Sequence, residues 1–172
     1  LRKLLSELFR SLDYLLEGTQ QRPSVLKPEE HAGFLAVIQK TASKDVYHAA
    51  LADLSRWLTQ YHGEKAVILI DEYDTPIYAA HTRGYSREML DFMRAFLGGG
   101  LKDNINLYKG VVTGILRVAR ESLFSGLNNL GVYSMLSAKY ATAFGFTEAE
   151  VEDICQRLGK PELLAGMRDT YN

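Results

Sequence analysis

Hydrophobic residues recur at helical spacing through the first third of the chain. Leucines repeat every three or four positions across residues 1–16, and Gly18 follows where such a helix would end. After a polar stretch, the same spacing predicts helices at residues 28–40 and 46–61. Residues 1–63 are therefore expected to form a helical lead-in.

Continuous apolar runs follow the lead-in. The run at residues 66–70 (AVILI) is rich in β-branched residues and has no polar face, which is typical of a strand covered on both faces by helices in a parallel sheet. The segment at 107–113 (LYKGVVT) predicts a second strand, and 132–136 (VYSML) a third. We therefore expect a sheet core at 64–136 and a helical C-terminal part at 137–172.

Further helices are predicted from capping signals and spacing. Ser86 can cap a helix with one apolar face, and the three glycines at 98–100 are expected to end it. Thr147 and Glu150 have capping-box spacing, and Pro161 is expected to start a short last helix. Strands bounded by helices predict a single α/β domain in which a parallel sheet is flanked by helices.

Composition limits the class of protein without identifying it. Of the 172 residues, 47% are hydrophobic and 24% are charged, as in globular proteins, and the net charge of -1 does not indicate nucleic acid as a partner. The one cysteine, Cys155, excludes an internal disulfide framework and fits a reducing compartment. No apolar run approaches the roughly 18 residues of a membrane span, so we expect a cytoplasmic protein with no membrane contact.

Three carboxylates follow the first predicted strand directly: Asp71, Glu72 and Asp74. In open α/β sheets, ligands bind beyond the carboxyl ends of the strands. Four hydrophobic residues followed by Asp-Glu form the Walker B pattern of P-loop ATPases, whose aspartate holds Mg²⁺ and whose glutamate orients or deprotonates the attacking water. The alternative is that these acidic residues only mark the exit of the strand into solvent.

The second predicted strand ends in Thr113, and Gly114 and Arg117 follow it. In AAA-type ATPases a polar residue at the end of the strand beside Walker B touches the same water and the γ-phosphate. The Thr113 hydroxyl suits that contact, and Arg117 can reach a phosphate oxygen or a partner. An ordinary strand-to-turn transition is the alternative. The ATPase interpretation requires Asp71 and Glu72 to share a crevice with Thr113 at the ends of neighbouring parallel strands.

Three motifs together resemble a known family. They are DEYDTPI at 71–77, TGILRVARESLFSGLNNL at 113–130 and FGFTEAEV at 144–151. In combination they resemble the AAA-ATPase-like domain common in bacterial proteins. The resemblance implies a P-loop NTPase core related to the AAA and STAND ATPases, with ATP and Mg²⁺ as ligands. It also implies a larger protein, often carrying a restriction-endonuclease-like nuclease domain, and leaves a homo-oligomer open.

The resemblance also implies roles for individual residues. Asp71 matches the magnesium aspartate and Glu72 the catalytic glutamate. Thr113 matches the sensor on the adjacent strand, and Arg117 the arginine that follows it. Asp74 belongs to the family pattern, where either a metal contact or a hydrogen bond that stabilises the strand end would explain it.

One element of the family pattern is absent from this sequence. The phosphate-binding loop G-x-x-x-x-G-K-[ST], whose backbone N–H groups and lysine hold the phosphates, occurs nowhere in the 172 residues. In the family this loop comes earlier, so we expect a chain truncated upstream of Leu1, whose parent protein is an ATPase. The alternative is a non-catalytic interaction or scaffold module that lost the loop. A nucleotide-free nuclease is disfavoured because no Glu-x-Lys follows the carboxylates.

The missing loop generates a first prediction. Without the lysine and the backbone cradle, most of the electrostatic stabilisation of a triphosphate is absent, so the 172-residue chain alone should be inactive as an ATPase. Isothermal titration of this chain with Mg-ATP should show no tight binding. A dissociation constant in the micromolar range would prove the expectation wrong.

Overall fold

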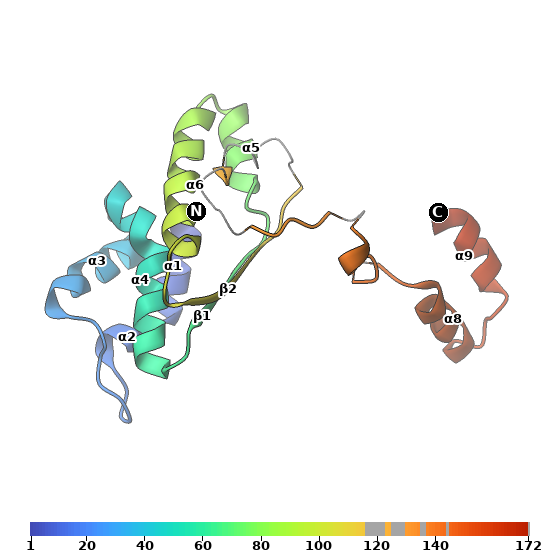
Figure 1. Ribbon diagram of the computed structural model, residues 1–172, viewed down its shortest axis with the longest axis horizontal. Coiled ribbons are helices and arrows are strands. Elements are labelled where there is room, and N and C mark those ends of the chain that lie inside the picture. The colour runs from blue at the N-terminus through green and yellow to red at the C-terminus, as the bar shows by residue number, and fades with distance from the viewer. Residues whose placement is uncertain (116–122, 125–129, 135–136, 144, 172) are drawn as a thin grey trace. The chain divides into compact units, whose positions relative to one another are not determined.

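The structure is a computed structural model, shown in Figure 1. It describes residues 1–115, 123–124, 130–134, 137–143 and 145–171. The chain divides into two compact units, Leu1–Leu130 and Gly131–Asn172, and each is described by itself.

The first unit contains the predicted helical lead-in and both strands of the described sheet. Its elements are α1 (Arg2–Ser11), α2 (Tyr14–Glu17), α3 (Pro28–Gln39), α4 (Lys44–His62), β1 (Ala66–Ile70), α5 (Thr75–Thr82), α6 (Ser86–Leu101) and β2 (Leu107–Val112). The helices predicted at 28–40 and 46–61 are confirmed as α3 and α4. The helix predicted at 1–16 is interrupted after Ser11, and α5 was not predicted. None of the described helices combines the length and apolar character needed to cross a bilayer.

Strands β1 and β2 lie side by side and run parallel (Figure 1). Their register pairs Ala66 with Leu107 and Ile70 with Val112, with one irregularity after Ala66. Parallel neighbours need a crossover connection, and α5 and α6 provide it. The two strands therefore end at the same edge of the sheet.

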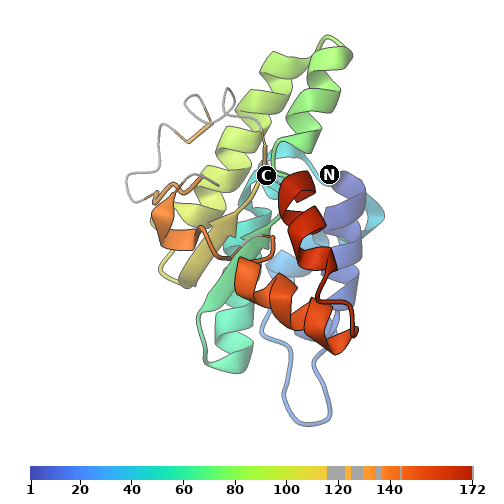
Figure 2. The same ribbon diagram turned by 90° about the vertical axis from the view of Figure 1, so that its right-hand side faces the viewer.

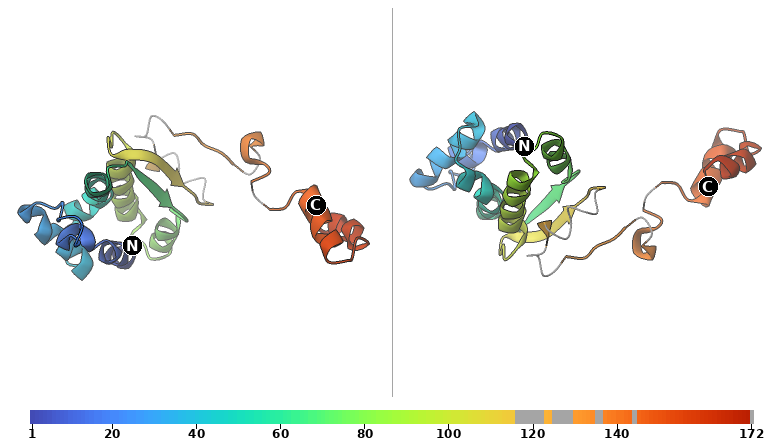
Figure 3. Two further views of the ribbon diagram at one scale, coloured as in Figure 1. Left: turned by 90° about the horizontal axis from the view of Figure 1, so that it is seen from below. Right: turned by 90° about the horizontal axis from the view of Figure 1, so that it is seen from above.

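Helices cover one face of this sheet. Ile68 is buried, whereas Val67 and Leu69 are 54% and 73% exposed. Figure 3 shows α4 and α6 on one side of the two strands. The expectation that β1 is covered on both faces is wrong for the described residues, because its alternate side chains point away from these helices.

The described sheet has two strands. The predicted third strand at 132–136 is not confirmed, since 132–134 are not in a strand and 135–136 lie outside the described residues. The structure thus supports the α/β class with a parallel sheet flanked by helices. The complete P-loop core is not confirmed and stays a prediction.

Aromatic packing holds the lead-in helices together. Phe9 of α1 lies 4.9 Å from Phe34 of α3 between ring centroids, and Trp57 of α4 lies 5.7 Å from Phe34. All three rings are almost completely buried. The aromatic rings lie on the sides of α1, α3 and α4 that face one another. Their packing buries them and forms the core of the lead-in.

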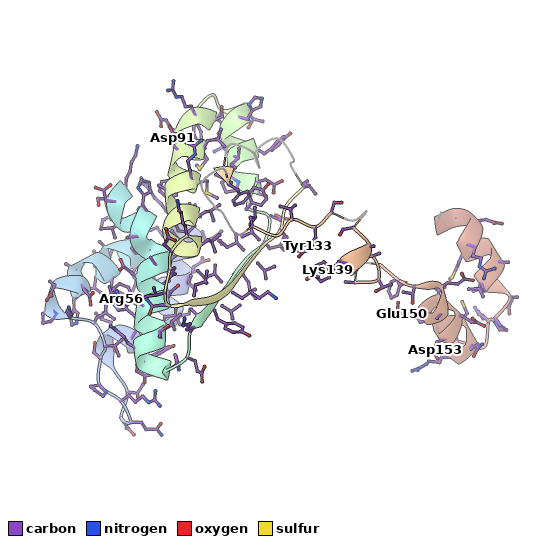
Figure 4. All side chains as sticks on the ribbon, viewed as in Figure 1. Arg56, Asp91, Tyr133, Lys139, Glu150 and Asp153 are labelled. Carbon is purple, nitrogen blue, oxygen red and sulfur yellow. The ribbon has the colours of Figure 1, made fainter. Side chains whose placement is uncertain are left out.

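An ion pair at the edge of this core joins α3 to α4. Arg56, labelled in Figure 4, lies 2.7 Å from the carboxylate of Glu30, which also accepts a hydrogen bond from the Trp57 indole at 3.2 Å. Burial acts to raise the pKa of Glu30, but hydrogen bonds from the Lys27 N–H, Arg56 and Trp57 outweigh it and lower that pKa. The ionised carboxylate is therefore the form that ties the helices together.

The sequence predicted that the glycines at 98–100 end the helix. This prediction is wrong, because α6 continues to Leu101. A Cβ at Gly100 would lie 2.6 Å from the Leu51 Cβ on α4, whereas a Cβ at Gly98 would meet nothing within 4 Å. Gly100 is also buried. The glycine at this position therefore permits close approach of α6 to α4, which outweighs its poor helix propensity.

The second unit contains η1 (Ala138–Tyr140), α8 (Glu148–Arg157) and α9 (Leu163–Tyr171). Figure 2 shows α8 and α9 packed as a pair. Thr147 and Glu150 form the predicted capping box, and hydrogen bonds from the Thr147 N–H and hydroxyl lower the pKa of Glu150. The buried Cys155 lies against Met167, with 3.8 Å between their sulfur atoms. The helices predicted from Thr147 and Pro161 are confirmed, the second beginning at Leu163.

The glycine run in α6 generates a second prediction. Gly100→Ala should lower the free energy of unfolding by about 1–3 kcal/mol, because the new methyl group overlaps Leu51. Gly98→Ala is the matched control and should raise it by about 0.5–1 kcal/mol, since it improves helix propensity in open space. Urea unfolding of both variants checks the contrast, and equal effects would contradict the packing role of Gly100.

Candidate functional site

Backbone hydrogen bonds join the two turns that follow the strands. The Thr113 N–H donates to the Ile70 carbonyl at 2.9 Å, which extends the parallel ladder by one step beyond β2. The Tyr73 N–H then donates to the Thr113 carbonyl at 3.1 Å. Thr113 is therefore fixed to the turn after β1 through both its amide and its carbonyl.

Asp71 and Thr113 meet at this edge of the sheet, as the sequence predicted. The Thr113 hydroxyl donates to Asp71 Oδ1, and the Glu72 N–H donates to the same oxygen at 2.9 Å. Both side chains are exposed. Within the described residues, every hydrogen bond of the Asp71 carboxylate falls on Oδ1.

Glu72 adopts a backbone conformation that the sequence did not predict. Its φ is 51°, in the left-handed region that residues other than glycine rarely occupy. Its carboxylate accepts a hydrogen bond from the Thr75 hydroxyl at 3.2 Å and is otherwise exposed. Backbone strain of this kind clusters at functional sites. The sharp turn places Glu72 beside Asp71 and the end of β2.

Asp74 differs from the other two carboxylates of the motif because it is buried, with 3% of its surface exposed. Its Oδ2 accepts a hydrogen bond from the Ile115 N–H at 2.9 Å. Of the two roles considered for Asp74, the structure shows the hydrogen bond that stabilises the strand ends. Its role as a metal ligand stays a prediction.

Tyr73 is an anchor that the sequence reasoning missed. Its side chain is 7% exposed and lies 5.1 Å from the Phe124 ring between centroids, in an edge-on arrangement. The available signal was an aromatic residue between two carboxylates, which is unusual in a purely solvent-exposed turn. The other predicted site residue, Arg117, lies outside the described residues, and so do residues 125–129 of the second motif.

The donor set at Asp71 and Thr113 fits Mg²⁺. A carboxylate oxygen and a hydroxyl oxygen are hard donors, and Mg²⁺ commonly uses one or two carboxylates together with waters and substrate phosphates. In the part of the chain that the structure describes, no group of three or more His, Cys, Asp or Glu side chains could hold a metal ion. The described residues thus supply two oxygen donors at this edge, and a bound cation would need further ligands.

A known family matches most of the chain. The sequence profile of a family described as a predicted AAA-ATPase matches residues 4–124, which include both strands and all three carboxylates. The FGFTEAEV motif at 144–151 lies outside the matched residues.

One similar protein comes from Azotobacter chroococcum mcd 1 and is described as an uncharacterized protein in the vnfD 5' region. It is 33% identical over 107 residues, which cover 62% of this chain and 20% of the relative. The chain thus spans about a fifth of the length of that protein. No solved structure matches the chain.

The contact between Asp71 and Thr113 generates a third prediction. Thr113→Val and Asp71→Ala each remove one partner of the hydrogen bond, so a double-mutant cycle should give a coupling free energy of about 0.5–1.5 kcal/mol. Thr113→Ser is the control, because it keeps the hydroxyl and should retain the coupling to Asp71. Urea unfolding of the chain measures each corner of the cycle. Strictly additive effects of the two substitutions would show that the side chains do not interact.

Proposed function

The chain belongs to the predicted AAA-ATPase family, and from that premise we propose that it supplies the metal-binding and water-activating residues of a Mg²⁺-dependent ATPase. The observation that carries the proposal is the meeting of the Asp71 carboxylate with the Thr113 hydroxyl at the ends of two parallel strands. Ligands of open α/β sheets bind at this edge. Glu72, beside them, is an exposed carboxylate with a single hydrogen bond within the described residues.

Asp71 is the proposed cation ligand. Its Oδ1 receives two hydrogen bonds, which restrict the orientation of the carboxylate, and Oδ2 accepts none of the bonds within the described residues. Because these hydrogen bonds hold the carboxylate in one orientation, little reorganisation would be needed when a cation binds. A bound Mg²⁺ ion would supply neutralisation of the charge that develops on the phosphate oxygens.

Glu72 is the proposed group that orients or deprotonates the attacking water. One of its oxygens accepts from the Thr75 hydroxyl, which limits the rotation of the carboxylate. The other oxygen can accept from a water molecule, as a general base requires. The left-handed backbone at Glu72 supports this role, since the turn that it forms holds the Glu72 N–H against the Asp71 carboxylate.

Thr113 is the proposed sensor of the phosphate group. A hydroxyl carries one proton, and in this structure the Thr113 hydroxyl gives it to Asp71. With a cation on Asp71, that carboxylate would be a weaker acceptor. The Thr113 hydroxyl would then be able to donate to a phosphate oxygen instead, which would couple this residue to the bound ligand.

The triphosphate itself must be held by groups outside this sequence. No phosphate-binding loop occurs in the 172 residues, and the similar Azotobacter chroococcum protein is about five times as long as its matched segment. We therefore assign ATP binding and turnover to the longer protein, with this chain contributing Asp71, Glu72 and Thr113. Arg117 is proposed to contact phosphate or a partner.

The fourth prediction tests the role of Glu72 in the longer protein. Glu72→Gln should leave Mg-ATP binding largely intact and lower kcat by at least two orders of magnitude, because it removes the water-orienting charge and keeps the cation ligand. Glu64→Gln is the matched control, since Glu64 is also exposed but precedes β1 at the opposite end of the strand. Steady-state phosphate release and a nucleotide-binding titration measure the two quantities.

Two outcomes would overturn the proposal. Turnover by Glu72→Gln at the wild-type rate would show that Glu72 does not activate water. A wild-type protein that binds no Mg-ATP at all would favour the alternative of a scaffold that keeps the ATPase fold without its chemistry.

A further inference from the structure

Asp74 and Tyr73 hold the turn after β2 at two points on either side of Gly114. The Tyr73 N–H binds the Thr113 carbonyl at 3.1 Å, and Asp74 Oδ2 accepts from the Ile115 N–H at 2.9 Å. Thr113 and Ile115 flank one glycine, so the path of the chain through this turn is fixed at both ends. These two contacts come from consecutive residues of the DEYD segment.

Gly114 shows how closely the two turns approach. A Cβ at this position would lie 2.6 Å from Tyr73 Cε1 and 2.8 Å from Asp74 Oδ1, distances at which no side chain fits. Gly114 is not among the glycines with positive φ, so space and not backbone conformation requires it. The missing side chain is what lets the Ile115 N–H reach the Asp74 carboxylate.

The two residues that hold this turn, Tyr73 and Asp74, are buried, whereas the Asp71–Thr113 contact is exposed. Asp74 and Tyr73 are 3% and 7% exposed, and the Tyr73 ring packs on the buried Phe124. The hydrogen bond from the Ile115 N–H to Asp74 is part-buried and its acceptor is a carboxylate, which makes it stronger than a hydrogen bond between neutral groups. The Asp74–Ile115 bond therefore determines the position of the turn, and the exposed hydroxyl of Thr113 follows it.

We propose that Asp74 is a positioning residue for the candidate site: by holding Ile115 it keeps the Thr113 hydroxyl within reach of Asp71. Its effect on turnover rests on the proposed ATPase function, but its effect on the Asp71–Thr113 contact does not. Asp74 acts here as a hydrogen-bond acceptor, so its task needs an oxygen atom at the right place. A metal ligand would need the negative charge as well.

The test compares Asp74→Asn with Asp74→Ala. Asparagine keeps an oxygen that can accept from the Ile115 N–H and loses the charge, whereas alanine loses both. Gly114→Ala is a second variant that displaces the same turn while Asp74 stays in place. In the 172-residue chain, the double-mutant cycle between Asp71 and Thr113 is repeated on each background, after circular dichroism has confirmed folding.

The proposal expects the coupling between Asp71 and Thr113 to survive in Asp74→Asn and to vanish in Asp74→Ala and Gly114→Ala. In the longer protein, Asp74→Ala should lower kcat on the order of 10²-fold with little change in the KM for ATP, because the group is misplaced and not removed. Asp74→Asn should restore most of the kcat.

Each contrary result has a distinct meaning. Coupling that persists in both Asp74→Ala and Gly114→Ala would overturn the positioning role, whatever the enzyme does. An equal loss of kcat in Asp74→Asn and Asp74→Ala, with a higher Mg²⁺ requirement in both, would overturn it in favour of a metal ligand. If the wild-type protein hydrolyses no ATP, the proposed function fails while the coupling measurements still decide the role of Asp74.

Discussion

The parallel register of β1 with β2 is the constraint on which the candidate site depends. Because Ile70 pairs with Val112, the first residue beyond each strand lies at the same edge, and Asp71 meets Thr113 across 42 positions of sequence. A slip of one residue would turn one strand's side chains to the opposite face and separate the pair. Burial of Ile68 against the helices opposes such a slip, so the packing of the covered face fixes the geometry of the site.

Local patterns were sufficient to predict β1, β2 and their parallel pairing, but the strand predicted at 132–136 is not confirmed. The apolar run at 66–70 has the β-branched composition of a buried strand, and the helix after Ser86 supplies the crossover that parallel neighbours require. Given these two facts, the residue types at Asp71 and Thr113 were enough to place them together. The capping box at Thr147 was predictable for the same reason, because its partners lie within one helical turn.

Features that depend on approach between distant segments were not predictable from such patterns. The glycines at 98–100 carry the local signal of a helix end, but α6 continues to Leu101 and Leu51 of α4 fills the space beside Gly100, which only the tertiary structure reveals. The exposed face of β1 was missed because a fully apolar run does not show which of its sides a helix covers. The left-handed turn at Glu72 was missed because a glutamate gives no signal for positive φ.

The DEYD segment divides its carboxylates between two opposite tasks, and burial decides which residue does which. A cation ligand or a base must keep lone pairs open to solvent and pay little to exchange water, which suits the exposed Asp71 and Glu72. A carboxylate that fixes backbone must have its acceptors engaged away from water, as in Asp74. The turn at Glu72 separates the two groups, since Asp71 directly before it is exposed whereas Tyr73 and Asp74 directly after it are buried. One short segment can therefore present reactive groups and also anchor the neighbouring strand that completes the site.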